Sequence, residues 1–112
     1  GQPIYTDEQY DCFVENGYDH ADFCLRVKGD SMIGARIYNG DIVFICAQPD
    51  VKDGEIAVVL IDDEATLKRV YKMGDRIILR AENPAYPPME FRKRDGKVVR
   101  ILGKAIAFQG KL

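Results

Sequence analysis

The feature that most constrains the fold is a succession of short apolar runs, each closed by a turn signal. The signals are Gly- and Asp-containing pairs that recur about every 8–12 residues, a spacing typical of an all-β sandwich or barrel. No stretch shows the apolar spacing of a three-turn helix. The sequence therefore predicts a mainly β fold, with at most a short helical turn after residue 31. The expected strands are residues 23–28, 42–47, 55–61, 64–72, 76–80, 89–94 and 97–108.

The charge balance argues against a stand-alone nucleic-acid binder. Sixteen Lys and Arg residues oppose eighteen Asp and Glu residues in the 112-residue chain, which gives a net charge of −2. The sequence therefore lacks the basic footprint that neutralises phosphates. The short basic run Arg92–Lys93–Arg94 is typical of a solvated hairpin face. We expect no direct DNA binding by this chain.

Run lengths and cysteine usage indicate the compartment. No apolar run exceeds the six residues of Ile56–Ile61, far below the roughly 20 that a membrane span needs. The N-terminal sequence does not resemble a signal peptide. Cys12, Cys24 and Cys46 show no C-x-x-C spacing, and His20 is the one histidine. We therefore expect a cytoplasmic protein with no membrane contact, no metal and no cofactor.

The hydrophobic pattern begins at Asp22. Residues 1–21 are polar and acidic, and their aromatic residues follow no regular period. We predict an N-terminal arm there. Residues 22–112 contain all the expected strands and are long enough for one folded domain with its own core.

Ser31 is a candidate nucleophile because it lies in Gly29–Asp30–Ser31–Met32, directly after an expected strand. A serine at such a junction exposes its hydroxyl, and neighbouring backbone N–H groups can point at a developing oxyanion. The hydroxyl needs a base to become nucleophilic. The usual base is histidine, but His20 lies on the polar arm, where a solvated surface residue is the simpler interpretation.

Lysine is the other known activator of serine, and Lys68 is the candidate. In an alternating strand, Thr66, Lys68 and Val70 share one face, while Leu67 and Arg69 take the other. Burial would lower the pKa of the lysine, and the neutral amine could then accept the serine proton. From the pattern alone, a solvent-facing strand lysine is the simpler interpretation.

Six motifs follow one another along the chain: Gly29–Met32, Asn39–Val43, Asp53–Ala57, Thr66–Arg69, Glu82–Tyr86 and Gly103–Ile106. This ordered series resembles the catalytic domain of the LexA-type family, which includes LexA, the autocleaving prophage repressors and UmuD. The resemblance covers residues 22–112, and the order and spacing of the motifs make it specific. It implies a compact domain of short, strongly bent strands.

The resemblance also implies a Ser-Lys dyad, in which Ser31 matches the nucleophile and Lys68 the general base. Backbone N–H groups of Asp30 and Ser31 would form the oxyanion hole. Members of the family cut a bond, commonly Ala-Gly, in their own upstream linker. RecA filaments on single-stranded DNA prompt this cut as part of the SOS response to DNA damage. Gly1 then matches the residue just after the scissile bond.

A homodimer is expected from the last strand and from the resemblance together. LexA-type domains dimerise partly through C-terminal segments. The stretch 98–108 is long and apolar. Because it comes last, we expect it at a sheet edge, where its backbone could pair with that of a second copy. Ile106 and Phe108 would then be buried in the dimer.

The leading hypothesis is the C-terminal self-cleaving and dimerisation domain of a LexA-like or prophage-type transcriptional repressor. The alternative is a UmuD-like processed accessory subunit of a translesion DNA polymerase. An upstream helix-turn-helix would indicate the repressor, and a short upstream arm the accessory subunit. Signal-peptidase-like processing uses the same dyad, but the sequence shows no membrane anchor. A β interaction module without chemistry is the simplest alternative.

Overall fold

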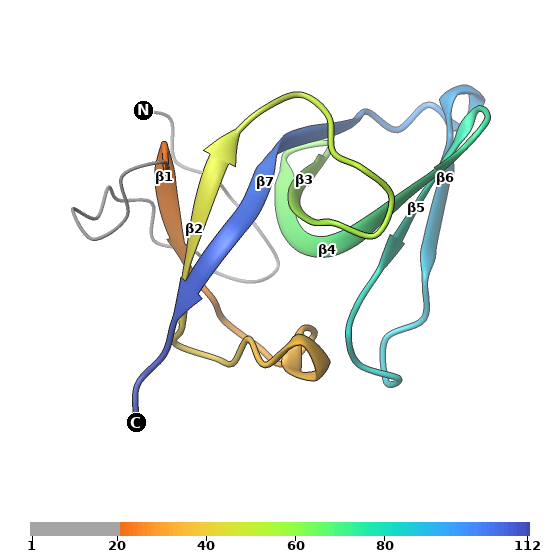
Figure 1. The fold of residues 1–112 in the computed structure, drawn as a ribbon. Coiled ribbons are helices and arrows are strands. Elements are labelled where there is room, and N and C mark those ends of the chain that lie inside the picture. The colour runs from red at the N-terminus through yellow and green to blue at the C-terminus, as the bar shows by residue number, and fades with distance from the viewer. Residues whose placement is uncertain (1–20) are drawn as a thin grey trace.

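The structure, a computed structural model, describes residues 21–112. In this part of the chain, strands form one antiparallel sheet with the order β1-β2-β7-β3-β4-β5-β6 (Figure 1). The predicted arm up to residue 20, with Gly1, Cys12 and His20, lies outside the described residues. The strands are β1 (Phe23–Arg26), β2 (Ile42–Ala47), β3 (Ile56–Ile61), β4 (Glu64–Met73), β5 (Arg76–Arg80), β6 (Met89–Arg92) and β7 (Val99–Gln109).

The prediction of a mainly β fold is confirmed. Several strands are rich in β-branched residues, as in Ile42–Ala47 and Ile56–Ile61, and such residues suit a pleated, half-buried backbone. The helical elements of residues 21–112 are two short 3-10 turns. The first, η1 (Ile33–Ala35), follows Ser31 as expected. The second, η2 (Lys93–Asp95), ends β6 earlier than the sequence predicts. No helix in this part of the chain is long and apolar enough to cross a membrane.

The sheet is strongly bent, and the curvature follows β4 and β7 (Figure 1). The pairing of β7 shifts register twice, opposite Phe44/Ile45 of β2 and opposite Val58/Val59 of β3. Such irregularities kink a strand and increase its twist. The bend divides the buried apolar residues into two clusters, one toward β1 and β2 and one toward β5 and β6.

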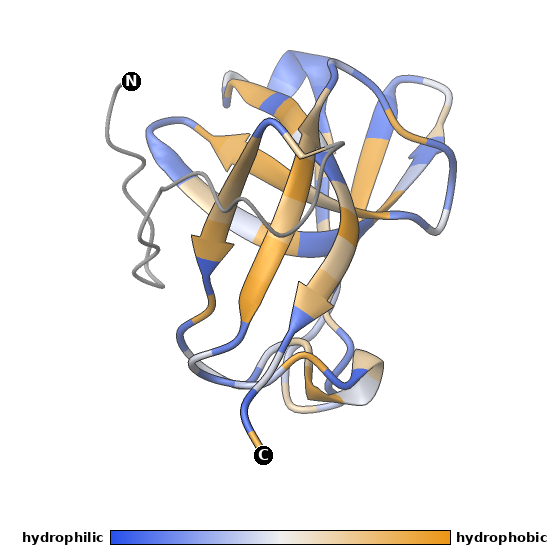
Figure 2. Cartoon of the chain, turned by 60° about the vertical axis from the view of Figure 1, so that its left-hand side comes forward, coloured by the Kyte–Doolittle hydropathy of each residue, from blue (hydrophilic) through white to orange (hydrophobic). Residues whose placement is uncertain are grey.

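The two clusters lie on opposite faces of β3 and β4. Val58 of β3 and Leu67 of β4 belong to the first cluster, whereas Val59 and Val70 belong to the second. Figure 2, coloured by hydropathy, shows hydrophobic residues along the strands that pass through the centre of the molecule. The central strands are therefore covered on both faces, which is the condition under which a polar strand residue becomes buried.

The position of β7 corrects one expectation. The last strand is not a sheet edge: it lies between β2 and β3, and the edges are β1 and β6. The last strand of a chain need not lie at the edge of a sheet. Here β7 inserts between β2 and β3, two strands that precede it in the sequence. Its pairing with β3 ends at Lys104, while its pairing with β2 continues to Gln109. Among the described residues, its C-terminal half is therefore paired along one side only.

Gly103 tests the packing of this central strand. A Cβ atom at Gly103 would lie 2.6 Å from the Cys46 carbonyl oxygen and 2.6 Å from Ile45 Cγ2, in the buried contact between β7 and β2. We expect Gly103→Ala to lower the free energy of unfolding by about 1–3 kcal/mol, because the backbone must shift to admit the methyl group. Urea unfolding measures the change. Gln109→Ala, at an exposed position of the same strand, is the control, and equal stabilities of the two variants would contradict the packing.

Candidate active site

Ser31 lies in the loop between β1 and β2, two residues before η1. The base of this loop is closed by the Val27 N–H, which donates to the Asp41 carbonyl at 2.8 Å. Within the loop, the Gly29 N–H donates to Asn39 Oδ1 at 2.8 Å. Gly29 has a φ of 99°, which glycine adopts at little cost. These contacts turn the chain so that Ser31 is only 3% exposed.

Lys68 lies in the middle of β4, opposite Ala57 of β3. Leu67 belongs to the first apolar cluster, so Thr66 and Lys68 point to the other side of the strand, as the alternation predicts. Only 6% of Lys68 is exposed. The interpretation of a solvent-facing lysine, which the pattern alone favoured, is therefore wrong.

The structure brings the Lys68 amine and the Ser31 hydroxyl together. Lys68 Nζ lies 3.4 Å from Ser31 Oγ, although the two residues are 37 positions apart in the chain. The same amine donates to Thr66 Oγ1 at 2.7 Å and to the Leu67 carbonyl at 3.2 Å. The Thr66 hydroxyl and the Leu67 carbonyl hold the amine on the serine side of the strand. All three acceptors are uncharged oxygens.

The turn of residues 29–32 is also the place of the predicted oxyanion donors. Asp30 and Ser31 are consecutive in this turn, and Met32 separates them from η1. The Ile33 N–H donates to the Asp30 carbonyl at 3.4 Å, which starts the 3-10 turn. Of the residues singled out by sequence, the structure thus assembles Asp30, Ser31 and Lys68 in one place. Gly1 lies outside the described residues.

A groove of about 400 Å³ leads to the lysine. Its walls come from the end of β3, from β4 and β6, from the loop of residues 81–88, and from Lys97 before β7. The lining is mostly apolar, with few charged groups, which suits an extended peptide segment. The residues that line it are Ile61, Glu64, Ala65, Thr66, Lys68, Tyr86, Pro87, Met89, Phe91 and Lys97.

Comparison with known families agrees with this site. The family model described as Peptidase S24-like matches residues 1–106, so the chain belongs to the Peptidase S24-like family. This is a serine protease family that includes self-cleaving LexA proteins. Within it, the chain is similar to the C-terminal part of the LexA repressors.

Individual relatives are LexA repressors from several bacteria. The protein of Anaeromyxobacter dehalogenans strain 2CP-1 is 43% identical over 118 residues, covering 100% of this chain and 51% of the relative. That of Caldicellulosiruptor saccharolyticus is 44% identical over 110 residues, covering 95% and 52%. That of Deinococcus radiodurans is 43% identical over 96 residues, covering 84% and 44%. The chain thus spans about half the length of the curated relatives it matches.

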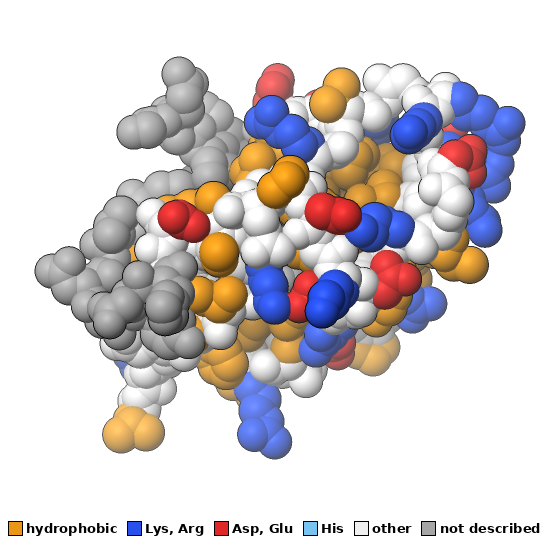
Figure 3. Space-filling model, turned by 45° about the horizontal axis from the view of Figure 1, so that its top comes forward, with side chains coloured by type: hydrophobic (Ala, Val, Ile, Leu, Met, Phe, Trp, Pro, Cys, Tyr) orange, Lys and Arg blue, Asp and Glu red, His pale blue; other side chains and the backbone are white. Residues whose placement is uncertain are grey.

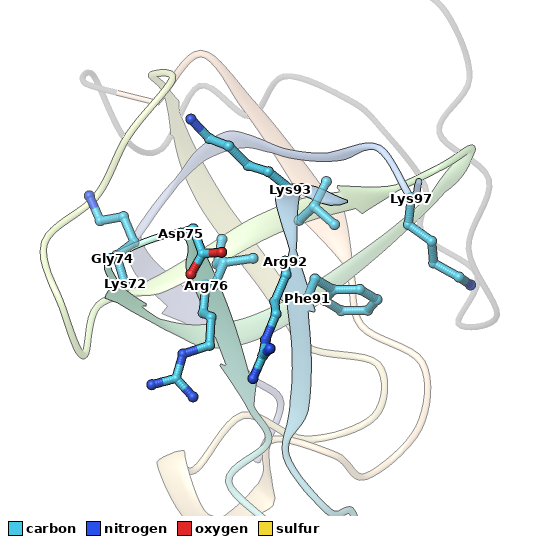
Figure 4. A pocket seen from close by; sticks show the side chains of 10 residues that line it. Lys72, Gly74, Asp75, Arg76, Phe91, Arg92, Lys93 and Lys97 are labelled. Atoms are coloured by element: carbon cyan, nitrogen blue, oxygen red, sulfur yellow. The ribbon is translucent and has the colours of Figure 1, made fainter. Parts of the chain in front are cut away.

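A second hollow lies at the far end of the sheet, between β5, β6 and the start of β7 (Figure 4). Basic side chains gather over this end of the molecule (Figure 3). Several of them already face carboxylates: Lys72 pairs with Asp50, and Arg76 and Arg92 both lie near Glu90. This arrangement is consistent with the solvated hairpin face expected for Arg92–Lys93–Arg94.

The sequence predicted no function for Thr66 or for the stretch Glu82–Tyr86. The contact of Thr66 with Lys68 could have been predicted, because a residue two positions before a strand lysine shares its face. The stretch Glu82–Tyr86 was known only as one of the motifs that carry the resemblance. Its contacts join segments distant in the chain, such as Asn83 with Asp30, 53 positions apart, and no local pattern reports them.

Proposed function

We propose that the chain is the self-cleaving domain of a LexA-like repressor and that Ser31 and Lys68 form its catalytic dyad. The observation that carries the proposal is the buried 3.4 Å contact between Lys68 Nζ and Ser31 Oγ. Burial of an amine disfavours its charged form, so the proposal expects the pKa of Lys68 to lie below that of an exposed lysine. A neutral amine next to a serine hydroxyl is the required starting state for general-base catalysis.

The reaction then proceeds by acyl transfer. Lys68 Nζ takes the proton from Ser31 Oγ as Oγ forms a bond to the scissile carbonyl carbon. The N–H groups of Asp30 and Ser31 stabilise the negative charge on the carbonyl oxygen. The C–N bond breaks, and the Lys68 ammonium returns its proton to the leaving amine. Water then hydrolyses the acyl ester, with Lys68 again acting as base.

The substrate in this proposal is the linker that precedes Gly1 in the longer protein. The linker enters the groove beside Lys68 as an extended segment, so the reaction is intramolecular and benefits from a high effective concentration. RecA filaments on single-stranded DNA act as the trigger and promote seating of the linker. Cleavage separates the DNA-binding half from this domain and so relieves repression. The domain division at residues 21 and 22 separates this post-cleavage arm from the catalytic domain.

The repressor is favoured over the UmuD-like accessory subunit by the relatives. The three proteins compared above are repressors, and each is about twice as long as the aligned region. The remaining half has the size expected for an upstream DNA-binding domain and linker.

Mapping of the cleavage product tests the function. A longer protein that carries the natural residues upstream of Gly1 is incubated at alkaline pH, or near neutral pH with RecA and single-stranded DNA. We expect a new N-terminus at Gly1 by mass spectrometry, formed faster with the filament. A product that begins elsewhere, or no product under either condition, would contradict the proposal.

The partner proposed for this domain is a second copy of itself. Within residues 21–112, the C-terminal half of β7 is paired along one side only, and it borders a groove to which Ile37, Val43 and Ile106 contribute. Phe108 on this half is 46% exposed. An antiparallel pairing of the two β7 halves around a two-fold axis would satisfy both backbones and cover Ile106 and Phe108.

Sedimentation equilibrium tests the dimer. We expect a mass near twice 12.7 kDa at micromolar concentration. Ile106→Asp is expected to yield the monomer mass, because a carboxylate would be buried without a partner at the interface. Val98→Asp, at an exposed position before the other end of β7, is the control and should remain dimeric. A wild-type mass near 12.7 kDa would exclude the dimer.

A further inference from the structure

The loop of residues 81–88 contacts the turn of residues 29–32 through two side chains. Asn83 Nδ2 donates to the Asp30 carbonyl at 2.9 Å. The Tyr86 hydroxyl donates to Asp30 Oδ1 at 2.6 Å. Both bonds reach across more than fifty positions of sequence, and both end on the residue directly before Ser31.

The same loop is tied to the lysine strand. Glu82 accepts a hydrogen bond from Arg69 Nε, and Arg69 directly follows Lys68 on β4. The Glu82 carbonyl also accepts from the Gly34 N–H at 2.7 Å, just beyond Ser31. A Cβ atom at Gly34 would lie 2.7 Å from that carbonyl oxygen, so the two backbones approach as closely as glycine allows. The loop therefore connects the two halves of the proposed dyad.

We propose that Asn83 and Tyr86 are positioning residues that set the direction of the oxyanion-hole N–H groups. This inference rests on the proposed function of Ser31 and Lys68. The Asp30 carbonyl and the Ser31 N–H belong to one peptide unit, which is planar and trans. In a trans unit the N–H points opposite to the C=O. When Asn83 holds the Asp30 carbonyl, it therefore also aims the Ser31 N–H toward the opposite side.

The orientation of the Asn83 amide is itself fixed. Its Oδ1 accepts the Ala85 N–H at 3.0 Å, two residues further along the loop. Such local pairing is the usual way in which asparagine stabilises a turn. Because Oδ1 is engaged with Ala85, the NH2 group is the one that faces the Asp30 carbonyl. Proline follows at position 84 and limits the freedom of the loop backbone.

Tyr86 acts from the groove side. Its side chain lines the groove that leads to Lys68, and its hydroxyl holds the Asp30 carboxylate. A peptide seated in this groove excludes water from the Tyr86–Asp30 bond, which strengthens it at a lower local dielectric constant. The hydrogen bond thus becomes stronger when substrate is in place.

Self-cleavage of the longer protein tests the inference through the rate and its pH profile. Asn83→Asp keeps the shape and the acceptor for Ala85 but replaces the donor with an oxygen facing the Asp30 carbonyl. Tyr86→Phe removes only the hydroxyl. We expect each variant to lower the rate plateau at alkaline pH by about tenfold to 10²-fold. The pH midpoint of Tyr86→Phe should stay that of the wild type, because this substitution changes no charge. The new carboxylate of Asn83→Asp should move the midpoint to higher pH, because a negative charge near Lys68 favours the ammonium form. Tyr38→Phe, an exposed tyrosine in the same region, is the control.

The outcomes separate this inference from the proposed function. Wild-type plateaus in Asn83→Asp and Tyr86→Phe would overturn the positioning role while leaving the dyad intact. A rate loss that merely follows a lower thermal midpoint and disappears at lower temperature would also overturn it, because that is the behaviour of a structural contact. Continued cleavage in Ser31→Ala would instead overturn the proposed function.

Discussion

Replacing Lys68 by methionine is expected to abolish self-cleavage without lowering the thermal midpoint of the domain at pH 7. The substitution keeps an unbranched side chain as far as the ε position and removes the amine that lies against Ser31 Oγ. Loss of the general base should slow cleavage by roughly 10³-fold or more. Ser31→Ala should be equally inactive, because the two residues act as one unit. Single-turnover cleavage followed by gel electrophoresis measures both rates.

The stability of Lys68→Met follows from proton binding. The proposal gives Lys68 a lower pKa in the folded chain than in the unfolded chain. At a pH between these two pKa values the unfolded chain binds more protons, so the free energy of unfolding rises with pH in this range. Below the folded pKa the whole cost applies, at about 1.4 kcal/mol for each unit of lowering. Methionine removes this cost but leaves Thr66 Oγ1 and the Leu67 carbonyl without the amine, at about 1 kcal/mol each.

We therefore expect Lys68→Met to have a thermal midpoint equal to or above that of the wild type at pH 7. The advantage of the variant should become smaller as the pH approaches the pKa of a free lysine. Lys111→Met, at an exposed terminal position, is the matched control and should change neither cleavage nor stability. A drop of several degrees in the Lys68→Met midpoint at pH 7 would contradict a buried amine that is neutral in the folded state.

The pH profile of self-cleavage is the second large effect. The rate should rise about tenfold per pH unit in the acidic limb, because only the neutral fraction of Lys68 can accept the Ser31 proton. It should level off once the pH exceeds the folded pKa of Lys68. Thr66→Val should move this midpoint to lower pH, since the Thr66 hydroxyl accepts a hydrogen bond from the amine at 2.7 Å and so favours its charged form.

Thr66→Ser, which keeps the hydroxyl, is the control and should retain the wild-type midpoint. A profile without pH dependence would show that deprotonation of Lys68 does not limit the reaction. A shift of the Thr66→Val midpoint to higher pH would show that the hydroxyl stabilises the neutral amine instead.

The fold class was predictable because it depends on local pattern. Turn signals such as Asp53–Gly54 and Gly74–Asp75 divide the chain into short apolar or alternating runs, and these runs become strands. The order of strands was not predictable in this way. The sequence predicts that β7 is long and apolar. Its place between β2 and β3 depends on pairing with strands that lie far from it in the chain. Among the described residues, only its C-terminal half, which pairs with β2 but not with β3, has the unpaired edge that the sequence predicted.

Two site residues, Ser31 and Lys68, could be predicted from the family resemblance, but not from the local sequence pattern alone. Strand alternation could place Lys68 on the face of Thr66, but it could not show that both faces of β4 are covered. The family resemblance, rather than the pattern, favoured a buried lysine. The roles of Asn83 and Tyr86 depend on contacts across more than fifty positions, which single-sequence periodicity does not encode.

Labelling of the chain with a fluorophosphonate tests the central claim most directly, because it needs no linker substrate. Such reagents phosphonylate an activated serine, and Ser31 is the only serine in the sequence. Intact-mass spectrometry of this 112-residue chain counts the adducts, and peptide mapping locates them. The account predicts one adduct, on Ser31, that forms faster as the pH rises and forms at least about 10²-fold more slowly in Lys68→Met. An adduct on another residue, or equal labelling of Ser31 in Lys68→Met, would contradict it.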